Sequence, residues 1–296
     1  MTTREGQQLM KRTRMLRERL DQGTVLAAGV YNALFARIAE QTGFQAVYVT
    51  GFGTAARYGY PDVGLVTQTE MVENLRYICA ATSLPVVADA DTGYGGVINA
   101  RRTVSEYERI GVAGLHMEDQ VFPKKCGFME GKQVVEREEA VSKVKAAVDA
   151  RSDPDFLLIA RTDALAVNGW DDTVARAEAY LEAGADMVFV DGIRTRDDLE
   201  VYSKRLAGRG LPCLYNGALV SPTDARALGF RLQIMAGLAL GAVYASANEA
   251  MKALRDTGTT REVIERYQIP GDVGLNEALG LSGYYELERR YAATAG

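Results

Sequence analysis

The sequence predicts an α/β fold, namely a (β/α)8 TIM barrel followed by extra C-terminal helices. Its 296 residues suit one barrel of this kind. Eight short apolar or β-branched runs alternate with helical patterns, which is typical of a parallel sheet covered by helices. A doubly wound open sheet is the alternative. It usually has fewer units and a G-x-G-x-x-G turn after its first strand, which "AAGVYNA" does not match.

The expected strands and helices alternate along the chain. The strands span 24–31, 46–51, 84–91, 113–119, 155–163, 186–192, 211–217 and 231–237. Helical patterns include 31–43, 69–82, 99–111, 137–151 and 171–184. Three of these helices are expected to end at a glycine, the favoured residue just past a helix end: Gly43, Gly111 and Gly184.

Both ends of the chain predict further helices. The first twenty residues form a charged amphipathic pattern, without a secretory signal, whose apolar residues are Leu9, Met10, Leu16 and Leu20. We expect residues 1–250 to form the barrel with this N-terminal helix and residues 251–296 to form a helical extension. The extension is predicted to pack on its own barrel or on another subunit through Tyr267, Tyr284, Tyr285 and Tyr291.

Composition excludes several classes of partner. Hydrophobic residues make up 47% and charged residues 25%, an ordinary globular balance. The net charge of -5 lacks a compensating basic face, so no nucleic-acid partner is expected. The apolar run 232–251 is broken by glycines and contains Gln233, so we expect a strand and a helix rather than a membrane span. Three widely spaced cysteines favour a cytoplasmic location.

Polar residues recur where the expected strands end. In a (β/α)8 barrel the catalytic groups project from these carboxyl ends. The residues in question are Tyr48, Thr50, Gly51, Asp89, Asp91, Glu118, Asp119, Arg161, Asp163, Asp191 and Asn216. The sequence therefore predicts a functional site at this end of the barrel.

The stretch "ADADTGYGG" indicates a metal site. Asp89 and Asp91 end one apolar strand and Glu118 ends the next, which places three carboxylates close together. Oxygen ligands without thiolate or imidazole favour Mg²⁺, with Mn²⁺ as the second choice. The alternative is that each acid caps a helix or forms a loop salt bridge. The single histidine, His116, makes a histidine-based zinc site or a Ser-His-Asp triad a weak hypothesis.

Arg161 follows the buried run "FLLIA", so its guanidinium needs an anionic partner. That partner is either Glu118 or the carboxylate of a substrate. We favour the substrate, because a divalent metal beside a guanidinium suits a 2-oxo acid. The stretch "VTGFG" adds glycine N–H groups and the Thr50 hydroxyl near such a carboxylate, unless it is only a turn.

The ordered set "YVTG", "DADTGYGG", "EDQ", "PKKCG" and "ARTDA" resembles the isocitrate lyase and phosphoenolpyruvate mutase superfamily over most of the chain. It is most similar to the branch of methylisocitrate lyases, dimethylmalate lyases and oxaloacetate hydrolases. The resemblance implies a homotetramer, a dimer of dimers that exchanges a C-terminal helix between partners. It also implies bound Mg²⁺ and an enolate of pyruvate or a similar 2-oxo acid.

The resemblance also implies roles for single residues. Asp89 matches a direct metal ligand, and Asp91 and Glu118 match ligands through water. Catalytic roles fall on Cys126, Lys124, Arg161 and Tyr48. Substrate binding falls on Tyr48, Thr50, Gly51, Phe52, Asp62, Arg161 and Asn216.

The loop "KKCGF" favours carbon–carbon bond cleavage. In the family resemblance, lyases carry the cysteine, whereas phosphoenolpyruvate mutases and phosphonopyruvate hydrolases carry a "K-T-N" loop. A thiol flanked by lysines can supply a proton to a carbanion at neutral pH. The predicted function is a Mg²⁺-dependent lyase that cleaves a 2-hydroxy di- or tricarboxylate, of the 2-methylisocitrate or alkylmalate type, to a 2-oxo acid such as pyruvate.

Three departures from the family pattern concern the substrate. Phe128 stands where the lyases have histidine, no glutamate follows Asn216, and Asp191 replaces a glutamate. The missing glutamate and Asp191 favour a small diacid or oxaloacetate over a tricarboxylate. His116 shares a strand face with Glu118 and either packs or points into the barrel. The alternatives are an oxaloacetate decarboxylase or hydrolase, a carboxyphosphonoenolpyruvate-type phosphonomutase, or a non-catalytic binder of an oxo acid.

Overall fold

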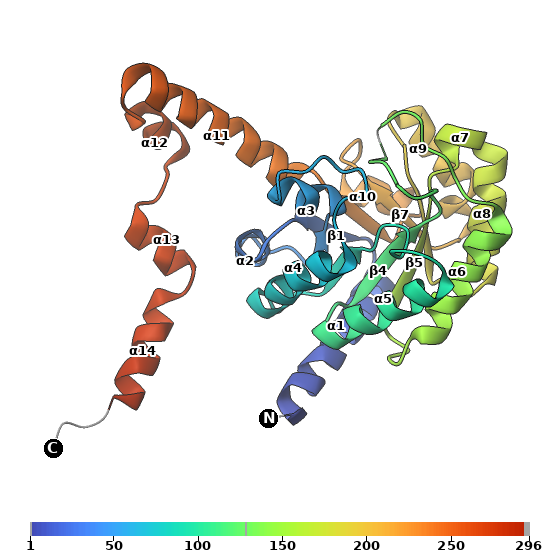
Figure 1. Ribbon diagram of the computed structural model, residues 1–296, viewed down its shortest axis with the longest axis horizontal. Helices are drawn as coiled ribbons and strands as arrows, with labels where there is room; N and C mark the ends of the chain where they lie inside the picture. The colour runs from blue at the N-terminus through green and yellow to red at the C-terminus, as the bar shows by residue number, and fades with distance from the viewer. Residues whose placement is uncertain (1, 128, 293–296) are drawn as a thin grey trace. The chain divides into compact units, whose positions relative to one another are not determined.

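The computed structural model describes residues 2–127 and 129–292, with side chains from Arg12 onward, so Phe128 lies outside the described residues. Eight parallel strands close into a barrel in sequence order (Figure 1). They are β1 (Val25–Val30), β2 (Ala46–Val49), β3 (Val86–Asp89), β4 (Gly114–Glu118), β5 (Leu157–Thr162), β6 (Met187–Val190), β7 (Cys213–Asn216) and β8 (Leu232–Met235). Each strand lies within its predicted run, and the (β/α)8 prediction is confirmed.

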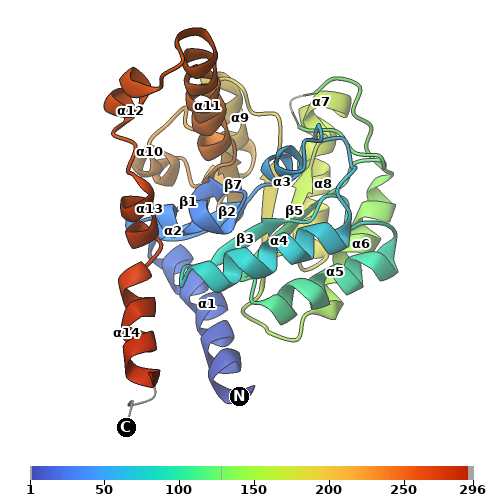
Figure 2. The same ribbon diagram turned by 60° about the vertical axis from the view of Figure 1, so that its left-hand side comes forward.

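Helices follow the strands and cover the outside of the barrel. They are α2 (Ala33–Gln41), α4 (Gln68–Ala81), α5 (Val97–Ile110), α6 (Arg137–Ala150), α8 (Trp170–Glu182), α9 (Arg196–Arg205) and α10 (Pro222–Ala227). Figures 1 and 2 show α4, α5 and α6 side by side. The connections hold short helical turns: α3 (Gly51–Arg57), α7 (Leu165–Asn168) and η1 (Ala207–Arg209). The predicted glycines end their helices with positive φ, 85° at Gly43, 92° at Gly111 and 99° at Gly184.

Two apolar clusters make the core. One fills the space between strands and helices, and the other fills the inside of the barrel. The inner cluster includes Tyr48, Phe189 and Leu214, together with Leu16 and Leu20 from α1 (Thr2–Gln22). The predicted N-terminal helix therefore packs against the inside of the barrel, while Leu9 and Met10 lie outside the described side chains. Since α1 occupies the amino-terminal mouth, the carboxyl ends of the strands are left for chemistry.

The C-terminal part of the chain is helical, as predicted. By compactness the chain divides into Met1–Leu240 and Gly241–Gly296, and the division falls inside α11 (Leu238–Thr257). After α11 come α12 (Arg261–Tyr267), α13 (Asp272–Ala278) and α14 (Leu281–Tyr291). The run 232–251 forms β8 and part of α11, which confirms the strand and helix. Among the described helices, none combines the length and apolar character that crossing a bilayer needs.

Asp119 links β4, β5 and α8 within the buried core. Its carboxylate accepts hydrogen bonds from the Thr162 hydroxyl (2.7 Å), the Asp163 N–H (2.9 Å) and the Tyr180 hydroxyl (2.7 Å), and it lies 3.3 Å from Arg176. We expect Asp119→Ala to lower the free energy of unfolding by about 3–5 kcal/mol, because it leaves buried donors and a cation unpaired. Urea denaturation measures this. A loss below about 1 kcal/mol would contradict the role, and Asp119→Asn should lose less than Asp119→Ala.

Candidate active site

Asp89, the last residue of β3, lies at the centre of the polar groups at the carboxyl end of the barrel. One of its oxygens accepts the Gly51 N–H at 3.0 Å and the Tyr48 hydroxyl at 3.4 Å. The other accepts the Asp91 N–H at 3.0 Å. Three donors, two from the end of β2 and one from the turn after β3, thus hold one carboxylate in place. A Cβ on residue 51 would lie 2.6 Å from this carboxylate, so the close approach needs glycine.

The Asp89 carboxyl is ionised at neutral pH. Burial favours the protonated acid, but the basic neighbours His116, Lys124 and Arg161 outweigh burial and lower the pKa of Asp89 to about 2. An ionised carboxylate at the end of a barrel strand is the ligand type that a divalent cation requires.

Asp91 and Glu118 have buried carboxyl oxygens whose charge is only partly compensated by neighbouring groups. Among the described residues, one Asp91 oxygen and both Glu118 oxygens accept no hydrogen bond. They do form ion pairs, Asp91 with Lys124 at 2.8 Å and Glu118 with Arg161 at 3.2 Å. Burial raises the pKa of Asp91 to about 6 and that of Glu118 well above its usual range. Both acids are therefore short of positive charge.

The carboxyl groups of Asp89, Asp91 and Glu118 are the type of ligand that Mg²⁺ and Mn²⁺ prefer. The three carboxyl groups offer hard oxygens, and the uncompensated ones are those that would gain most from a cation. In the described part of the chain no three acidic, histidine or cysteine side chains gather tightly enough to ligate an ion together. The expected arrangement does not need such a group, because only Asp89 would bind directly and the others would bind through water.

His116 points into the barrel and contacts Tyr48. It is fully buried, and burial lowers its pKa to about 4, so the imidazole is neutral. Its Nε2 lies 2.7 Å from the Tyr48 hydroxyl, and the two rings stack at 5.6 Å. With that hydroxyl donating to Asp89, His116 donates to the Tyr48 oxygen. His116 therefore positions Tyr48, in addition to packing against Phe189.

Arg161 is held by several acids at once. Its guanidinium donates to both oxygens of Asp163, at 2.9 and 3.1 Å. It also lies 3.2 Å from Glu118 and 3.6 Å from Asp191, and it sits over the Phe189 ring at 5.2 Å. The pairing with Glu118, the less favoured of the two partners expected from the sequence, is present. A substrate carboxylate would share Arg161 with these acids.

The loop 121–136 brings Lys124 and Cys126 to the same region. The buried Lys124 ammonium pairs with Asp62 and, at 2.8 Å, with Asp91. Burial favours the neutral amine, but Asp91 and Glu118 outweigh it and raise the pKa of Lys124 well above its usual range. The Cys126 N–H donates to the Asp62 carbonyl at 3.0 Å. Lys124 thus joins Asp91 to Asp62, and Asp62 in turn holds the backbone of Cys126.

Three predicted substrate-binding residues lie around this centre. Thr50 is buried and caps α3 by accepting the Gly53 N–H at 3.3 Å. Phe52 is 41% exposed. Asn216, at the end of β7, accepts the Ala236 N–H at 3.5 Å. These contacts do not involve Asp89, so the roles of the three residues toward a substrate stay predictions.

Lys132 is a further buried cation of this region that was not among the predicted site residues. Its ammonium lies 2.8 Å from Asp163 and 3.6 Å from Asp191. Asp163 and Asp191 lie at strand ends, and two carboxylates buried there need a cation beside them. The sequence does not identify that cation as Lys132, because the path of a loop over a barrel is not a local property.

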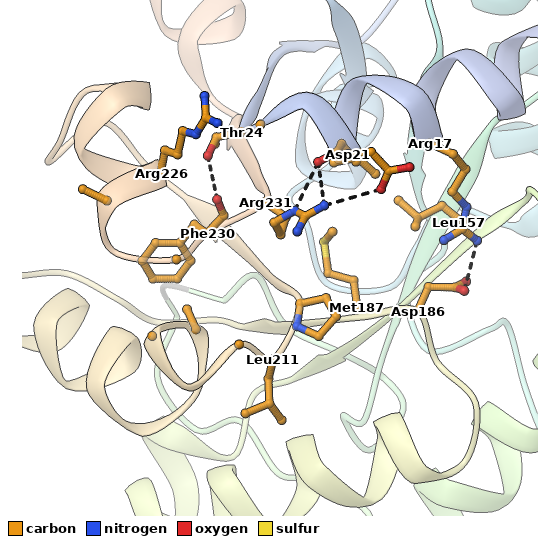
Figure 3. A pocket seen from close by; sticks show the side chains of 18 residues that line it. Arg17, Asp21, Thr24, Leu157, Asp186, Met187, Leu211, Arg226, Phe230 and Arg231 are labelled. Atoms are coloured by element: carbon orange, nitrogen blue, oxygen red, sulfur yellow. Dashed lines mark hydrogen bonds and ion pairs between the residues drawn. The ribbon is translucent and has the colours of Figure 1, made fainter.

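A cavity of about 580 Å³ opens at the opposite end of the barrel, where α1 meets the strands (Figure 3). Its arginines are largely paired, Arg17 with Asp186 at 3.0 Å and Arg231 with the Leu20 carbonyl at 2.7 Å. Amino-terminal faces of such barrels serve stability, whereas catalytic groups lie at the carboxyl ends. We therefore place the candidate site at the carboxyl end, despite the volume of this cavity.

Thiol labelling tests the environment of the cysteines. Burial raises the pKa of Cys79 and of Cys213 to about 12, whereas Cys126 is half-buried. We expect iodoacetamide at mildly alkaline pH to alkylate Cys126 in the native protein and all three only after denaturation. Peptide mass mapping reads the sites. Native labelling of Cys79 or Cys213 at the rate of Cys126 would contradict this structure.

A parallel barrel with buried acids, arginine and lysine at its carboxyl end defines an enzyme scaffold. The sequence profile described as phosphoenolpyruvate phosphomutase matches residues 16–255. The chain therefore belongs to this family and is an enzyme of the PEP mutase/isocitrate lyase superfamily.

Three similar proteins illustrate the range of the family. A 2,3-dimethylmalate lyase from Eubacterium barkeri is 39% identical over 272 residues, 90% of this chain and 93% of the relative. An oxaloacetate acetylhydrolase in complex with 3,3-difluorooxalacetate has a TM-score of 0.88 at 35% identity, covering 97% of this chain and 99% of that one. A phosphonopyruvate hydrolase in complex with oxalate and Mg²⁺ has a TM-score of 0.87 at 31% identity, covering 95% and 99%.

Proposed function

We propose that the chain is a Mg²⁺-dependent lyase that cleaves a carbon–carbon bond of a 2-hydroxy dicarboxylate of the alkylmalate type, or of 2-methylisocitrate, giving a 2-oxo acid such as pyruvate. The observation that carries the proposal is the segment 121–127, in which Lys124 lies 2.8 Å from the Asp91 carboxylate and the Cys126 N–H donates to the Asp62 carbonyl. The similarity to a dimethylmalate lyase supports the same reaction class.

The metal would be held by Asp89 directly and by Asp91 and Glu118 through water. When bound, Mg²⁺ supplies positive charge that polarises carbonyl and carboxylate oxygens of the substrate. The oxalate and Mg²⁺ of the phosphonopyruvate hydrolase complex support this cofactor. Arg161 would bind a substrate carboxylate, with Thr50 and the Gly51 segment beside it. Phe52, Asp62 and Asn216 complete the proposed binding set.

The reaction needs one base and one acid. A base takes the proton from the 2-hydroxyl, the bond between its carbon and the neighbouring carbon breaks, and the hydroxyl carbon becomes the carbonyl of the 2-oxo acid. The electron pair of the broken bond leaves on the other fragment as an enolate-type carbanion. The Cys126 thiol gives that carbanion a proton, and Lys124 stabilises the thiolate that results. Tyr48, held by His116, orients the substrate oxygen.

A panel of 2-hydroxy acids tests the proposal. Purified protein with Mg²⁺ is incubated with alkylmalates, 2-methylisocitrate and isocitrate, and release of pyruvate or glyoxylate is measured with a coupled dehydrogenase. We expect turnover of a small alkylmalate to exceed that of the tricarboxylates, since Asn216 is followed by no glutamate. If no 2-oxo acid is released from any of these acids, the lyase proposal is wrong.

Oxaloacetate is the second candidate substrate. The similarity to an oxaloacetate acetylhydrolase in complex with a difluorinated oxaloacetate favours it, as does Asp191 in place of glutamate. Oxaloacetate consumption, with oxalate and pyruvate measured separately, distinguishes hydrolase from decarboxylase. Phosphorus NMR of the protein with carboxyphosphonoenolpyruvate tests the phosphonomutase alternative, supported by a chloroplastic carboxyvinyl-carboxyphosphonate phosphorylmutase from Arabidopsis thaliana that is 39% identical over 92% of this chain.

We also propose that the chain assembles as a homotetramer in which C-terminal helices are exchanged between partners. Neither α13 nor α14 has a buried residue, so these helices build no core of their own. The tyrosines of α14, Tyr284, Tyr285 and Tyr291, would pack on a partner subunit. Light scattering gives the mass in solution, and a monomer for the full chain would refute the exchange.

A further inference from the structure

Lys132 is a buried cation that the proposed chemistry does not use. It is 8% exposed, and its ammonium bonds to Asp163 at 2.8 Å and to the Gly127 carbonyl at 2.6 Å. Asp191 lies 3.6 Å away. A lysine buried to this degree needs paired anions, and here both anions come from the ends of barrel strands. Lys132 therefore ties the loop 121–136 to the rigid barrel at β5 and β6.

The loop backbone lies close to Asp191 at Gly127, the residue whose carbonyl accepts a hydrogen bond from Lys132. A Cβ on residue 127 would lie 1.8 Å from an Asp191 oxygen, so only glycine allows this approach. On the other side of Cys126, Lys124 pairs with Asp62 and Asp91. Two lysines thus hold the two limbs of the loop, and Cys126 lies between them.

Asp163 joins this attachment to the substrate-binding arginine. One Asp163 oxygen accepts from Lys132 at 2.8 Å and from Arg161 at 3.1 Å, and the other accepts from Arg161 at 2.9 Å. Because one carboxylate serves both cations, the position of the loop and the orientation of Arg161 depend on each other. Removing Lys132 would disturb both.

We propose that Lys132 is a positioning residue, which holds the Cys126 loop against Asp163 and Asp191 and sets the orientation of Arg161 through Asp163. The inference rests on the proposed function for the reaction that Cys126 and Arg161 serve. The attachment itself is a property of the loop and is measurable without any substrate.

Alkylation of Cys126 by iodoacetamide is the first test. We expect Lys132→Met to raise the alkylation rate by about fivefold or more, because the loop leaves the barrel more often. Lys132→Arg, which can still reach Asp163, should restore most of the protection. Lys125→Met is the matched control. Among the described residues its ammonium bonds the Glu130 and Gly131 carbonyls of the same loop and no strand end, and its rate should stay within about twofold of the wild type.

Equal alkylation rates in Lys132→Met and Lys125→Met overturn the proposal. The buried thiols Cys79 and Cys213 report folding, since their labelling marks a variant that has unfolded. If Lys132→Met has unfolded, Gly127→Ala tests the proposal instead. Its methyl group displaces the loop from Asp191 while Lys132 is unchanged. We expect it to raise Cys126 alkylation by about fivefold as well, and an unchanged rate overturns the proposal.

Turnover separates this inference from the proposed function. With a substrate in hand, Lys132→Met should lower kcat by about tenfold or more through the Cys126 loop and also raise KM through Arg161, with Lys132→Arg recovering most of both. An unchanged kcat in Lys132→Met contradicts the inference. If no acid is turned over by the wild type, the proposed function fails, and the alkylation result still decides the role of Lys132.

Discussion

Cys126→Ser should retain its fold and lose carbon–carbon cleavage, with kcat lower by about 10²-fold to 10⁴-fold. A serine hydroxyl is much less acidic than a thiol, so it cannot deliver a proton to the carbanion at neutral pH. The neighbouring Lys124 ammonium is buried against Asp62 and Asp91, and nearby carboxylates raise its pKa well above its usual range. It therefore keeps its proton in the variant and cannot replace the thiol as proton donor. Steady-state kinetics on the best substrate of the panel measures the loss.

Cys79→Ala is the matched control for this result. Cys79 is buried on α4, away from the strand ends, and its loss should affect stability rather than kcat. Full activity of Cys126→Ser would remove the thiol from the mechanism. Equal losses in both variants would show that the effect is not specific to the loop.

Removal of the divalent metal should have the second large effect. We expect EDTA to lower activity by about 10²-fold or more, and Mg²⁺ or Mn²⁺ to restore it, because buried Asp91 and Glu118 oxygens accept no hydrogen bond from the described residues and are available to a hydrated cation. Asp89→Asn should weaken Mg²⁺ binding by about a hundredfold or more in calorimetric titration. Added metal should then fail to restore its activity at the concentrations that saturate the wild type.

Asp197→Asn is the control for the metal experiment, since it removes an exposed acid of α9. It should bind Mg²⁺ and turn over substrate like the wild type. Full activity after EDTA treatment would exclude the metal. Wild-type Mg²⁺ affinity in Asp89→Asn would show that the ion is held elsewhere.

The local pattern of the chain predicted the strands and helices well. Each barrel strand lies within its predicted run, and Gly43, Gly111 and Gly184 end their helices with positive φ. These features are encoded locally, by runs of apolar residues and by a backbone conformation that favours glycine. Parallel strands that alternate with helices then leave few topologies, so the closed barrel followed from the pattern.

The candidate site was predicted in part. The sequence predicts that Asp89, Asp91 and Glu118 lie together, because β3 and β4 are expected to be neighbours. In the structure β3 pairs with β4, and the Glu118 N–H donates to the Asp91 carbonyl at 2.8 Å. The sequence left two partners open for Arg161 and two roles for His116. The structure pairs Arg161 with Asp163 and Glu118, and it shows His116 bonded to Tyr48 inside the barrel.

The barrel can be read from the sequence because it depends on local pattern, and the same pattern predicts which polar residues follow the strands. Which buried charges share a partner depends on the three-dimensional fold. Lys132 and Asp163 lie 31 positions apart along the chain, yet one ion pair joins them, and no periodicity records it. Such pairs are set by the path of a loop over the strand ends and by the need to compensate every buried charge.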